Sequence, residues 1–354
     1  MYAGMSNAKN IIDETNVIAD FRSDTLTKPS TGMRAAMADA LVGDDVYNED
    51  PNTILLEEKL ADMTGMEHGL FFPTGTQSNL AALLSHCGRG DEYISGDEYH
   101  IFRDEAGGAA VLGGISPFPL PTDDRGGLTP DQVAASIKPD DSHCAVSKLL
   151  SLENTVSGRI QPLAQIKALA NVAHENGLNV HLDGARIFNA AIALNQPLKI
   201  VCSDVDSISI CLSKGLGAPI GSVLCGGEDF IRKAKRARKM LGGGMRQVGV
   251  LAACGLYALE NNIETLAQDH ANAKRLALGL SKINNLQVDP SIVDTNMVFV
   301  NPGAGHHAGL QAYLAGVGIV IGAQVPNIRF VTHMDIDEAA IDLTIKHVGD
   351  YYNQ

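Results

Sequence analysis

Short apolar runs rich in β-branched residues alternate with amphipathic segments over most of the chain. This alternation is typical of an α/β protein in which helices cover both faces of a mainly parallel sheet. The runs are almost continuously apolar, which suits strands that are buried on both faces. The pattern predicts strands at residues 69–72, 146–152, 178–182, 207–212 and 221–225.

Helices are predicted between and after these strands. Pro162 and Gly177 mark the two ends of one helix, because proline is tolerated in a first helical turn and glycine is a common C-terminal stop. Residues 228–241 predict an amphipathic helix with six basic side chains, which we interpret as a solvated face. Another helical stretch covers residues 248–262.

The pattern restarts after residue 262, which indicates a second domain. A helix at 269–283, strands at 296–300 and 328–331 and a closing helix from Asp335 predict a smaller C-terminal α/β domain. We therefore expect a loose arm at residues 1–16, a large domain at 17–265 and a small domain at 266–354.

The composition limits which kinds of molecule the protein is expected to bind. Of 354 residues 45% are apolar, and 41 acidic against 27 basic side chains give a net charge of -14, which argues against docking on nucleic acid or anionic lipid. No run approaches the roughly 18 apolar residues that span a bilayer, and the first sixteen residues do not resemble a signal peptide, so we expect a cytoplasmic protein. The six cysteines form no C-x-x-C pair, which favours buried free thiols over disulfides, and we expect no metal.

Three polar elements lie where open α/β sheets bind ligands, at the carboxyl ends of predicted strands. Residues 73–79 (PTGTQSN) open a helix whose backbone donors, with the Thr76 and Ser78 hydroxyls, could bind a phosphate. Asp183 ends one strand and Lys214 ends another, 31 residues later. Each element alone also fits an ordinary helix cap or salt bridge, such as one between Asp183 and the nearby Arg186.

Together the three elements are the attachment points that pyridoxal 5'-phosphate requires. A lysine amine would hold the aldehyde as a Schiff base, an aspartate would keep the ring nitrogen protonated, and a helix start would bind the phosphate. His100 lies between the phosphate turn and Asp183 in the sequence. We favour it as the flat group above the ring, over the alternative of a capping or core histidine.

Seven motifs, in order, resemble those of the low-specificity L-threonine aldolases. The resemblance extends from about residue 19 to the end of the chain and rests on residues 21–27 (FRSDTLT), 42–47 (VGDDVY), 73–77 (PTGTQ), 148–154 (KLLSLEN), 181–186 (HLDGAR), 213–217 (SKGLG) and 242–247 (GGGMRQ). It implies a fold-type I, aspartate aminotransferase-like enzyme that binds pyridoxal phosphate. The family also implies a homotetramer in which neighbouring chains share active sites.

The resemblance also implies residue roles. Lys214 would carry the Schiff base, Asp183 would meet the ring nitrogen, His100 would stack on the ring, and Gly75 and Thr76 would cradle the phosphate. Ser23, Arg186 and Arg329 match a clamp for the substrate carboxylate, Arg186 and Arg246 are also expected at the cofactor, and Tyr47, Lys239 and Arg246 match residues that approach from the adjacent subunit. His143 matches a second active-site histidine, competes with His100 as the catalytic base, and has a surface histidine as its alternative.

The implied reaction is a lyase reaction, the retro-aldol cleavage of L-threonine, L-allo-threonine and related β-hydroxy-α-amino acids to glycine and an aldehyde. A β-eliminating lyase is the alternative in the same class, and a cysteine desulfurase is disfavoured because no cysteine lies in a glycine- and serine-rich loop. Outside the class, residues 215–221 (GLGAPIG) superficially suggest a dinucleotide turn, but Pro219 would disturb the helix that such a turn opens. A scaffold protein would not explain Lys214 and Asp183.

Overall fold

The chain divides into two compact units in a computed structural model that describes residues 16–353. The larger unit is Lys28–Glu264, and the smaller one joins Met1–Thr27 to Thr265–Gln354. The second boundary falls where the sequence pattern restarts. Residues 16–27, however, belong to the smaller unit, whereas residues 17–27 were expected in the large domain. Phe21 explains the difference, because it is fully buried in the core of the smaller unit, 5.5 Å from the ring of Phe330.

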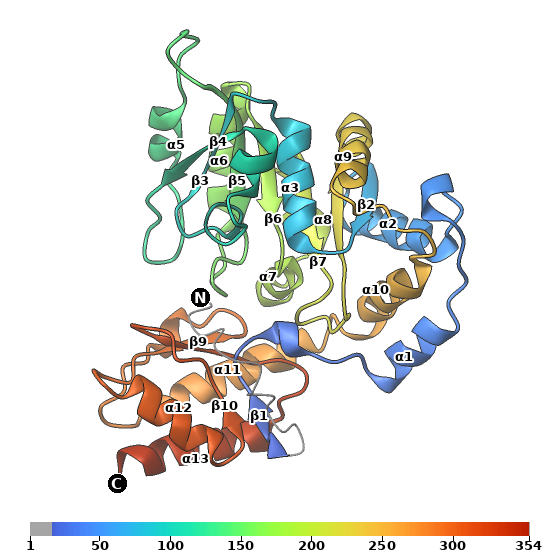
Figure 1. The fold of residues 1–354 in the computed structure, drawn as a ribbon. Coiled ribbons are helices and arrows are strands. Elements are labelled where there is room, and N and C mark those ends of the chain that lie inside the picture. Colours follow the sequence, from blue (N-terminus) through green and yellow to red (C-terminus); the bar gives the residue numbers. More distant parts are fainter. Residues whose placement is uncertain (1–15, 354) are drawn as a thin grey trace. The chain divides into compact units, whose positions relative to one another are not determined.

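A seven-stranded sheet forms the centre of the larger unit (Figure 1). Its strand order is β2-β8-β7-β6-β5-β3-β4. The strands are β2 (His68–Phe72), β3 (Asp91–Gly96), β4 (Ser116–Leu120), β5 (Val146–Glu153), β6 (Asn179–Asp183), β7 (Ser207–Cys211) and β8 (Ser222–Gly226). Only β8 runs antiparallel to its neighbours, so the carboxyl ends of the other strands share one edge of the sheet.

Helices connect these strands and cover the sheet. They are α1 (Thr31–Ala38), α2 (Pro51–Thr64), α3 (Gly75–His86), α4 (His100–Arg103), α5 (Pro130–Ser136), α6 (Leu163–Glu175), α7 (Ile187–Leu194), α8 (Leu198–Val201), α9 (Glu228–Met240) and α10 (Gly249–Asn261), with short turns η3 (Asp45–Tyr47) and η4 (Ala109–Gly113). The helices α3 and α9 lie side by side over β2 and β8 (Figure 1). Small residues of both helices, such as Ala81 and Ala234, pack there against Phe72 and Leu224.

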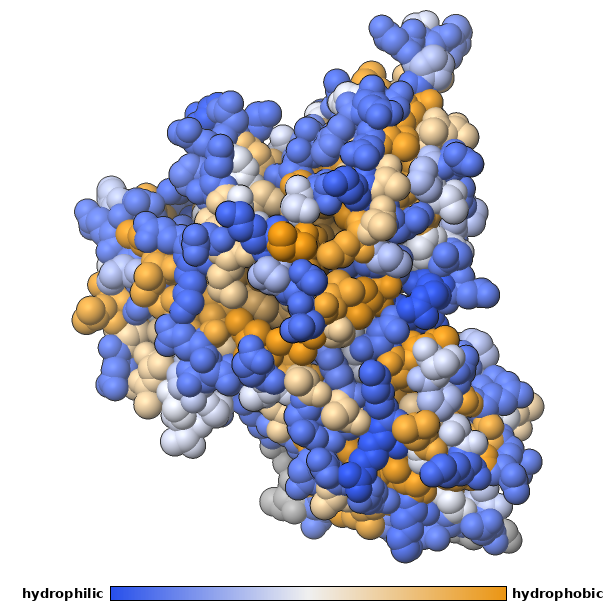
Figure 2. All heavy atoms as spheres, turned by 180° about the vertical axis from the view of Figure 1, so that it is seen from behind, coloured by the Kyte–Doolittle hydropathy of each residue, from blue (hydrophilic) through white to orange (hydrophobic). Residues whose placement is uncertain are grey.

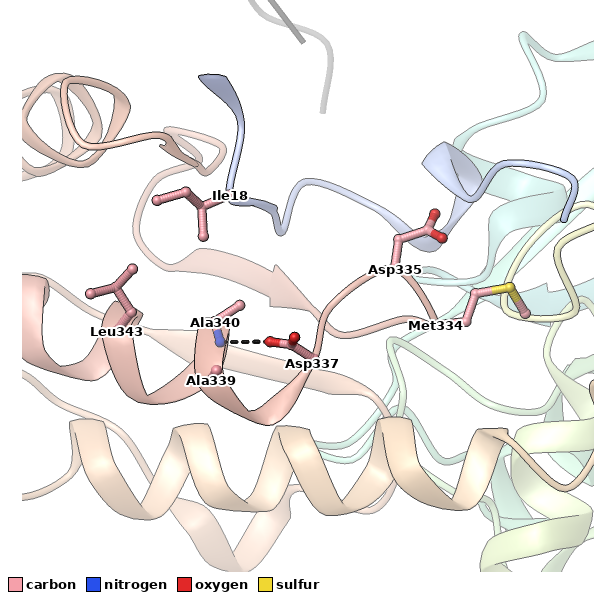
Figure 3. A pocket seen from close by; sticks show the side chains of 7 residues that line it. All are labelled: Ile18, Met334, Asp335, Asp337, Ala339, Ala340 and Leu343. Atoms are coloured by element: carbon pink, nitrogen blue, oxygen red, sulfur yellow. Dashed lines mark hydrogen bonds between the residues drawn. The ribbon is translucent and has the colours of Figure 1, made fainter. Parts of the chain in front are cut away.

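The smaller unit has two short sheets and three main helices. Its elements are β1 (Ala19–Asp20), η2 (Asp24–Leu26), α11 (Leu266–Leu280), η5 (Pro290–Ile292), β9 (Met297–Val300), α12 (His307–Ala315), β10 (Ile319–Val320), β11 (Ile328–Val331) and α13 (Glu338–Tyr352). β1 pairs with β10, and β9 pairs with β11. A pocket of about 450 Å³ lies at the start of α13, where Asp337 accepts a hydrogen bond of 2.8 Å from the Ala340 amide (Figure 3). None of the predicted site residues lines this pocket.

The predicted α/β class with a mainly parallel sheet is confirmed. All five predicted strands of the larger unit appear within one residue of their predicted ends. β3 and β4 were not predicted, because polar or breaking residues obscure them. β3 begins with Asp91 and Glu92, and Glu92 is buried in an ion pair with Lys138. β4 contains Pro117 and Pro119, which an edge strand tolerates.

The interpretation of the basic helix as a solvated face was wrong at one position. Arg238 of α9 is 3% exposed. Its guanidinium donates to the Asp45 carboxylate and to the Phe71 carbonyl, both at 2.8 Å. The side chain therefore ties η3 to the end of β2 from inside the unit. Within residues 16–353, no helix is both long and apolar enough to cross a bilayer.

Candidate active site

The carboxyl ends of β6 and β7 bring Asp183 and Lys214 to the same edge of the sheet. Asp183 is the last residue of β6 and pairs in register with Ser209 of β7, and Lys214 follows β7 by three residues. Cys211 ends β7, and burial raises the pKa of its thiol while the charges of Lys214 and Asp183 also act on it. The two residues thus share one neighbourhood, as their positions in the sequence predicted.

The phosphate turn lies against the end of β7. Thr74 caps α3, because its hydroxyl accepts from the Gln77 amide at 3.1 Å and its carbonyl from the Ser78 amide at 3.1 Å. This arrangement leaves the amides of Gly75 and Thr76 without an acceptor inside the helix, which suits an anion. A Cβ at Gly75 would lie 2.6 Å from Cys211 Sγ, so a side chain there would displace the turn.

Ser78 does not fit the role that the sequence predicted for its hydroxyl. The side chain is fully buried, and its oxygen accepts a hydrogen bond of 2.8 Å from the Ser209 hydroxyl of β7. It therefore links α3 to the sheet, because Ser78 lies on the face of α3 that packs against β7. The Thr76 side chain, in contrast, is exposed.

Asp183 is buried and surrounded by hydrogen-bond donors. The Ala185 amide donates to its Oδ1 at 3.0 Å, and Asn79 of α3 donates to its Oδ2 at 2.8 Å. Both contacts give the oxygens of this buried side chain the hydrogen-bond partners that water would otherwise supply. Asn79 also donates to Glu105 at 2.9 Å, which links the aspartate to a second buried carboxyl group.

Two acidic groups hold His100 in place. Its backbone amide donates to Glu153 Oε2 at 2.6 Å, and its Nδ1 lies 2.9 Å from Glu105 Oε1. Glu153 ends β5 and pairs in register with Asp183. The hydrogen bond to Glu105 raises the pKa of His100 above the ordinary value of a histidine. A partly exposed imidazole is therefore fixed close to Asp183.

Two acidic side chains near Asp183 bind their protons more tightly than ordinary carboxyl groups do. Burial, followed by the charge of Asp183, raises the pKa of Glu153, and burial also raises the pKa of Glu105. Ligand atoms of His100, Glu105 and Asp183 lie within 4.8 Å of one another, a spacing that a metal ion could also use. Hydrogen bonds from Asn79 to both carboxylates and between His100 and Glu105 already engage these atoms.

Sequence reasoning assigned no role to Asn79, Glu105 or Glu153. The sequence could have indicated Glu153, because this residue directly follows a predicted strand, as Asp183 does. Asn79 and Glu105 carried no such signal. Their roles depend on α3 and the segment after α4 meeting over the end of β6, which only the folded chain shows.

His143 does not reach this edge within its own chain. It precedes β5, an eight-residue strand whose far end is Glu153. A strand of this length spans roughly 25 Å. The loop between α5 and β5 projects from the opposite end of the unit (Figure 1). The side chain is 90% exposed, and its Nδ1 contacts Asp141 at 2.7 Å.

The other predicted site residues fall into three groups. Arg186 follows Asp183 closely and precedes α7, so it lies at the candidate site of the larger unit. Ser23 and Arg329 belong to the smaller unit, where Arg329 donates to the carbonyl of the residue before Ser23 at 3.2 Å. The carboxylate clamp spans both units and stays a prediction. The residues expected to serve an adjacent subunit, Tyr47, Lys239 and Arg246, are all exposed on the larger unit.

Comparison with known proteins agrees with this geometry. The chain belongs to the beta-eliminating lyase family, whose model matches residues 20–302. Within that class its relatives are low-specificity L-threonine aldolases. It is 48% identical to the enzyme of Escherichia coli strain K12 over 93% of this chain and 97% of the relative, and 41% identical to low-specificity L-threonine aldolase 1 of Arabidopsis thaliana over 92% and 94%.

Solved structures show the same fold. The threonine aldolase of Leishmania major superposes with a TM-score of 0.81 at 18% identity, over 94% of this chain and 99% of that one. The predicted family, the fold-type I architecture and the assignment as a lyase are confirmed. Pyridoxal phosphate is the cofactor of this family, and the Gly75 and Thr76 amides, Asp183 and Lys214 stay the groups predicted to bind it.

We expect Gly75→Ala to weaken binding of pyridoxal phosphate, because the added methyl would meet Cys211 Sγ and displace the amides that face the phosphate. The measurement is absorbance titration of the cofactor-free protein. Adding Cys211→Ala to the same chain should restore much of the affinity, since it removes the clashing atom. Equal affinity of Gly75→Ala and the unmodified protein would show that the turn does not bind the phosphate.

Proposed function

We propose that this protein cleaves L-threonine, L-allo-threonine and related β-hydroxy-α-amino acids to glycine and an aldehyde. The observation that carries the proposal is the convergence of three groups on one sheet edge. The turn at Gly75, the buried Asp183 and the amine of Lys214 lie at this edge, where each would meet a different part of one cofactor. The identity of 48% to a threonine aldolase supports the choice of reaction.

The protein's residues bind and orient the reactants. When bound, pyridoxal phosphate supplies an electron sink that lets the Cα–Cβ bond of the amino acid break. Lys214 would hold its aldehyde, and Asp183 would accept a hydrogen bond from the protonated ring nitrogen. Arg186, with Ser23 and Arg329, binds the substrate carboxylate, since a guanidinium matches a carboxylate through two parallel hydrogen bonds. This grip turns the bond to be broken out of the plane of the cofactor ring.

His100 is the proposed base. Glu105 engages its Nδ1, which directs Nε2 of the same ring away from Glu105 and makes it available to a substrate hydroxyl. A neutral imidazole in this tautomer accepts the hydroxyl proton as the aldehyde leaves. The ring also lies near Asp183, which is consistent with the predicted stacking on the cofactor.

Purified protein with pyridoxal phosphate should convert L-threonine and L-allo-threonine to glycine and acetaldehyde. Lys214→Ala should lose nearly all of this activity, because the covalent anchor is absent. Chromatography of the products and an aldehyde-coupled assay measure both. Pyruvate and ammonia as the main products would instead support a β-elimination, the reaction in the family's descriptive name.

The base assignment predicts a pH dependence. If His100 must be neutral, kcat/KM rises with pH through its pKa, which Glu105 raises. Glu105→Gln removes the main cause of the raised pKa, so the acidic limb should move to lower pH. The pH profile of kcat/KM on L-threonine measures the shift. Glu98→Gln removes an exposed carboxylate two residues before His100 and should leave the limb in place; an unmoved limb in Glu105→Gln would contradict the role of His100.

A homotetramer that shares active sites is part of the proposal. Tyr47 is 72% exposed, and the neighbouring Leu41 and Val42 are 74% and 46% exposed, which supports a covered interface at this loop. Apolar groups also reach the surface on the face shown in Figure 2. His143 is likewise assigned to the site of a neighbouring chain, because its own sheet places it far from Lys214. The free cysteines support the cytoplasm as its location.

Subunit complementation tests whether neighbouring chains share their active sites. We expect His143→Asn and Lys214→Ala to be poorly active alone. Hybrids assembled from both chains should regain activity, since one chain supplies Lys214 and the other His143. A mixture of Lys214→Ala with Asp183→Ala is the control and should stay inactive, because both residues lie on one sheet edge. A mixture with His143→Asn that also stays inactive would exclude His143 from a neighbouring site.

A further inference from the structure

A line of buried side chains connects Asp183 to the opposite part of the sheet. Asn79 Nδ2 lies 2.8 Å from Asp183, and Asn79 Oδ1 lies 3.2 Å from His181 Nε2. His181 Nδ1 lies 2.9 Å from Ser207 Oγ, which lies 2.7 Å from His86 Nε2. The exposure of Asn79, His181 and Ser207 is 2%, 0% and 0%, so water does not compete for these contacts.

The amide of Asn79 has only one workable orientation. Two carboxyl groups, Asp183 and Glu105, lie 2.8 and 2.9 Å from its nitrogen. Its two N–H groups are both used there, and an oxygen in that place would face two acceptors. The Asn79 oxygen therefore faces His181, and it needs a donor from that ring.

His181 must supply that donor from Nε2. Burial lowers the pKa of His181 to about 3, so the ring is neutral and carries a single N–H. With the hydrogen on Nε2, its Nδ1 is an acceptor and receives the Ser207 hydroxyl. Every side chain from Ser207 to Asp183 then donates in the direction of the aspartate.

The outer residues continue the same direction. Burial lowers the pKa of His86 to about 4, so it too is neutral. Ser207 has used its hydrogen on His181, so His86 donates from Nε2, and its Nδ1 faces the Asn179 amide at 3.3 Å. Because both rings are neutral, their hydrogen-bond partners fix both tautomers. Aligned donors polarise one another, so each hydrogen bond strengthens the next one toward Asp183.

We propose that His181 is a positioning residue that, through Asn79, holds the Asp183 side chain oriented toward the ring nitrogen of the cofactor. Ser207 and His86 set the tautomer that makes this possible. The inference rests on the proposed cofactor chemistry, and it concerns side chains that do not touch substrate or cofactor themselves. It predicts that changes at His181 affect the interaction with the ring nitrogen and leave the phosphate turn intact.

The test compares two cofactors on the cofactor-free protein. Pyridoxal phosphate and its 1-deaza analogue, in which carbon replaces the ring nitrogen, are titrated by absorbance. His181→Leu removes the donor to Asn79 and should weaken binding of pyridoxal phosphate about tenfold, a typical effect of losing one buried hydrogen bond, with little change for the analogue. His181→Gln keeps an N–H donor and should recover most of the loss. Ser207→Ala should behave like a milder His181→Leu.

Ser85→Ala is the matched control, because it removes a buried hydroxyl that, among residues 16–353, bonds within α3 to the Ala81 carbonyl. It should leave both affinities unchanged. Equal losses for both cofactors in His181→Leu would mean general damage to the fold and would overturn the proposal, as would no loss for either. Failure of the unmodified protein to bind pyridoxal phosphate would instead overturn the proposed function, and this inference with it.

Discussion

A buried carboxylate at the end of β6 is the constraint on which the site depends. Asp183 is 2% exposed, and an isolated charge at such a place would be strongly unfavourable. The Ala185 amide and the Asn79 side chain compensate for its lost hydration. Asn79 can do so only because α3 crosses the sheet directly above β6 and β7. The helix that presents the anion-binding turn is thus the helix that stabilises the acid.

The burial of Asp183 also affects the acidic side chains around it. Glu105 and Glu153 are drawn into the network by Asn79 and by the His100 amide, and burial raises the pKa of both. A proton bound by Glu153 limits its repulsion from Asp183. Asp183 therefore keeps its donors among several carboxyl groups, with a histidine held at its side.

The acidic loop before α2 stabilises the fold, in addition to carrying a residue predicted for the site. Asp44 pairs with Arg246 at 3.0 Å, and Asp45 is buried against Arg238. Asp50 caps α2 through the Thr53 amide at 3.0 Å and accepts from the first amide of α10 at 2.9 Å. These contacts bind the loop to the segment around Arg246, and they leave the Tyr47 side chain facing outward.

The sequence by itself determined the elements whose patterns are strong, because continuous apolar runs and strand-end polar residues reflect local burial and the shared edge of parallel strands. It located Asp183, Lys214 and the turn at Gly75 in this way. Tertiary structure alone decided which polar residues meet. Asn79 and His181 act on Asp183 through contacts between segments about 100 residues apart, Arg238 is buried although its helix is basic, and the length of β5 separates His143 from Lys214. Periodicity records whether a side chain is buried, but it carries no information about its partner.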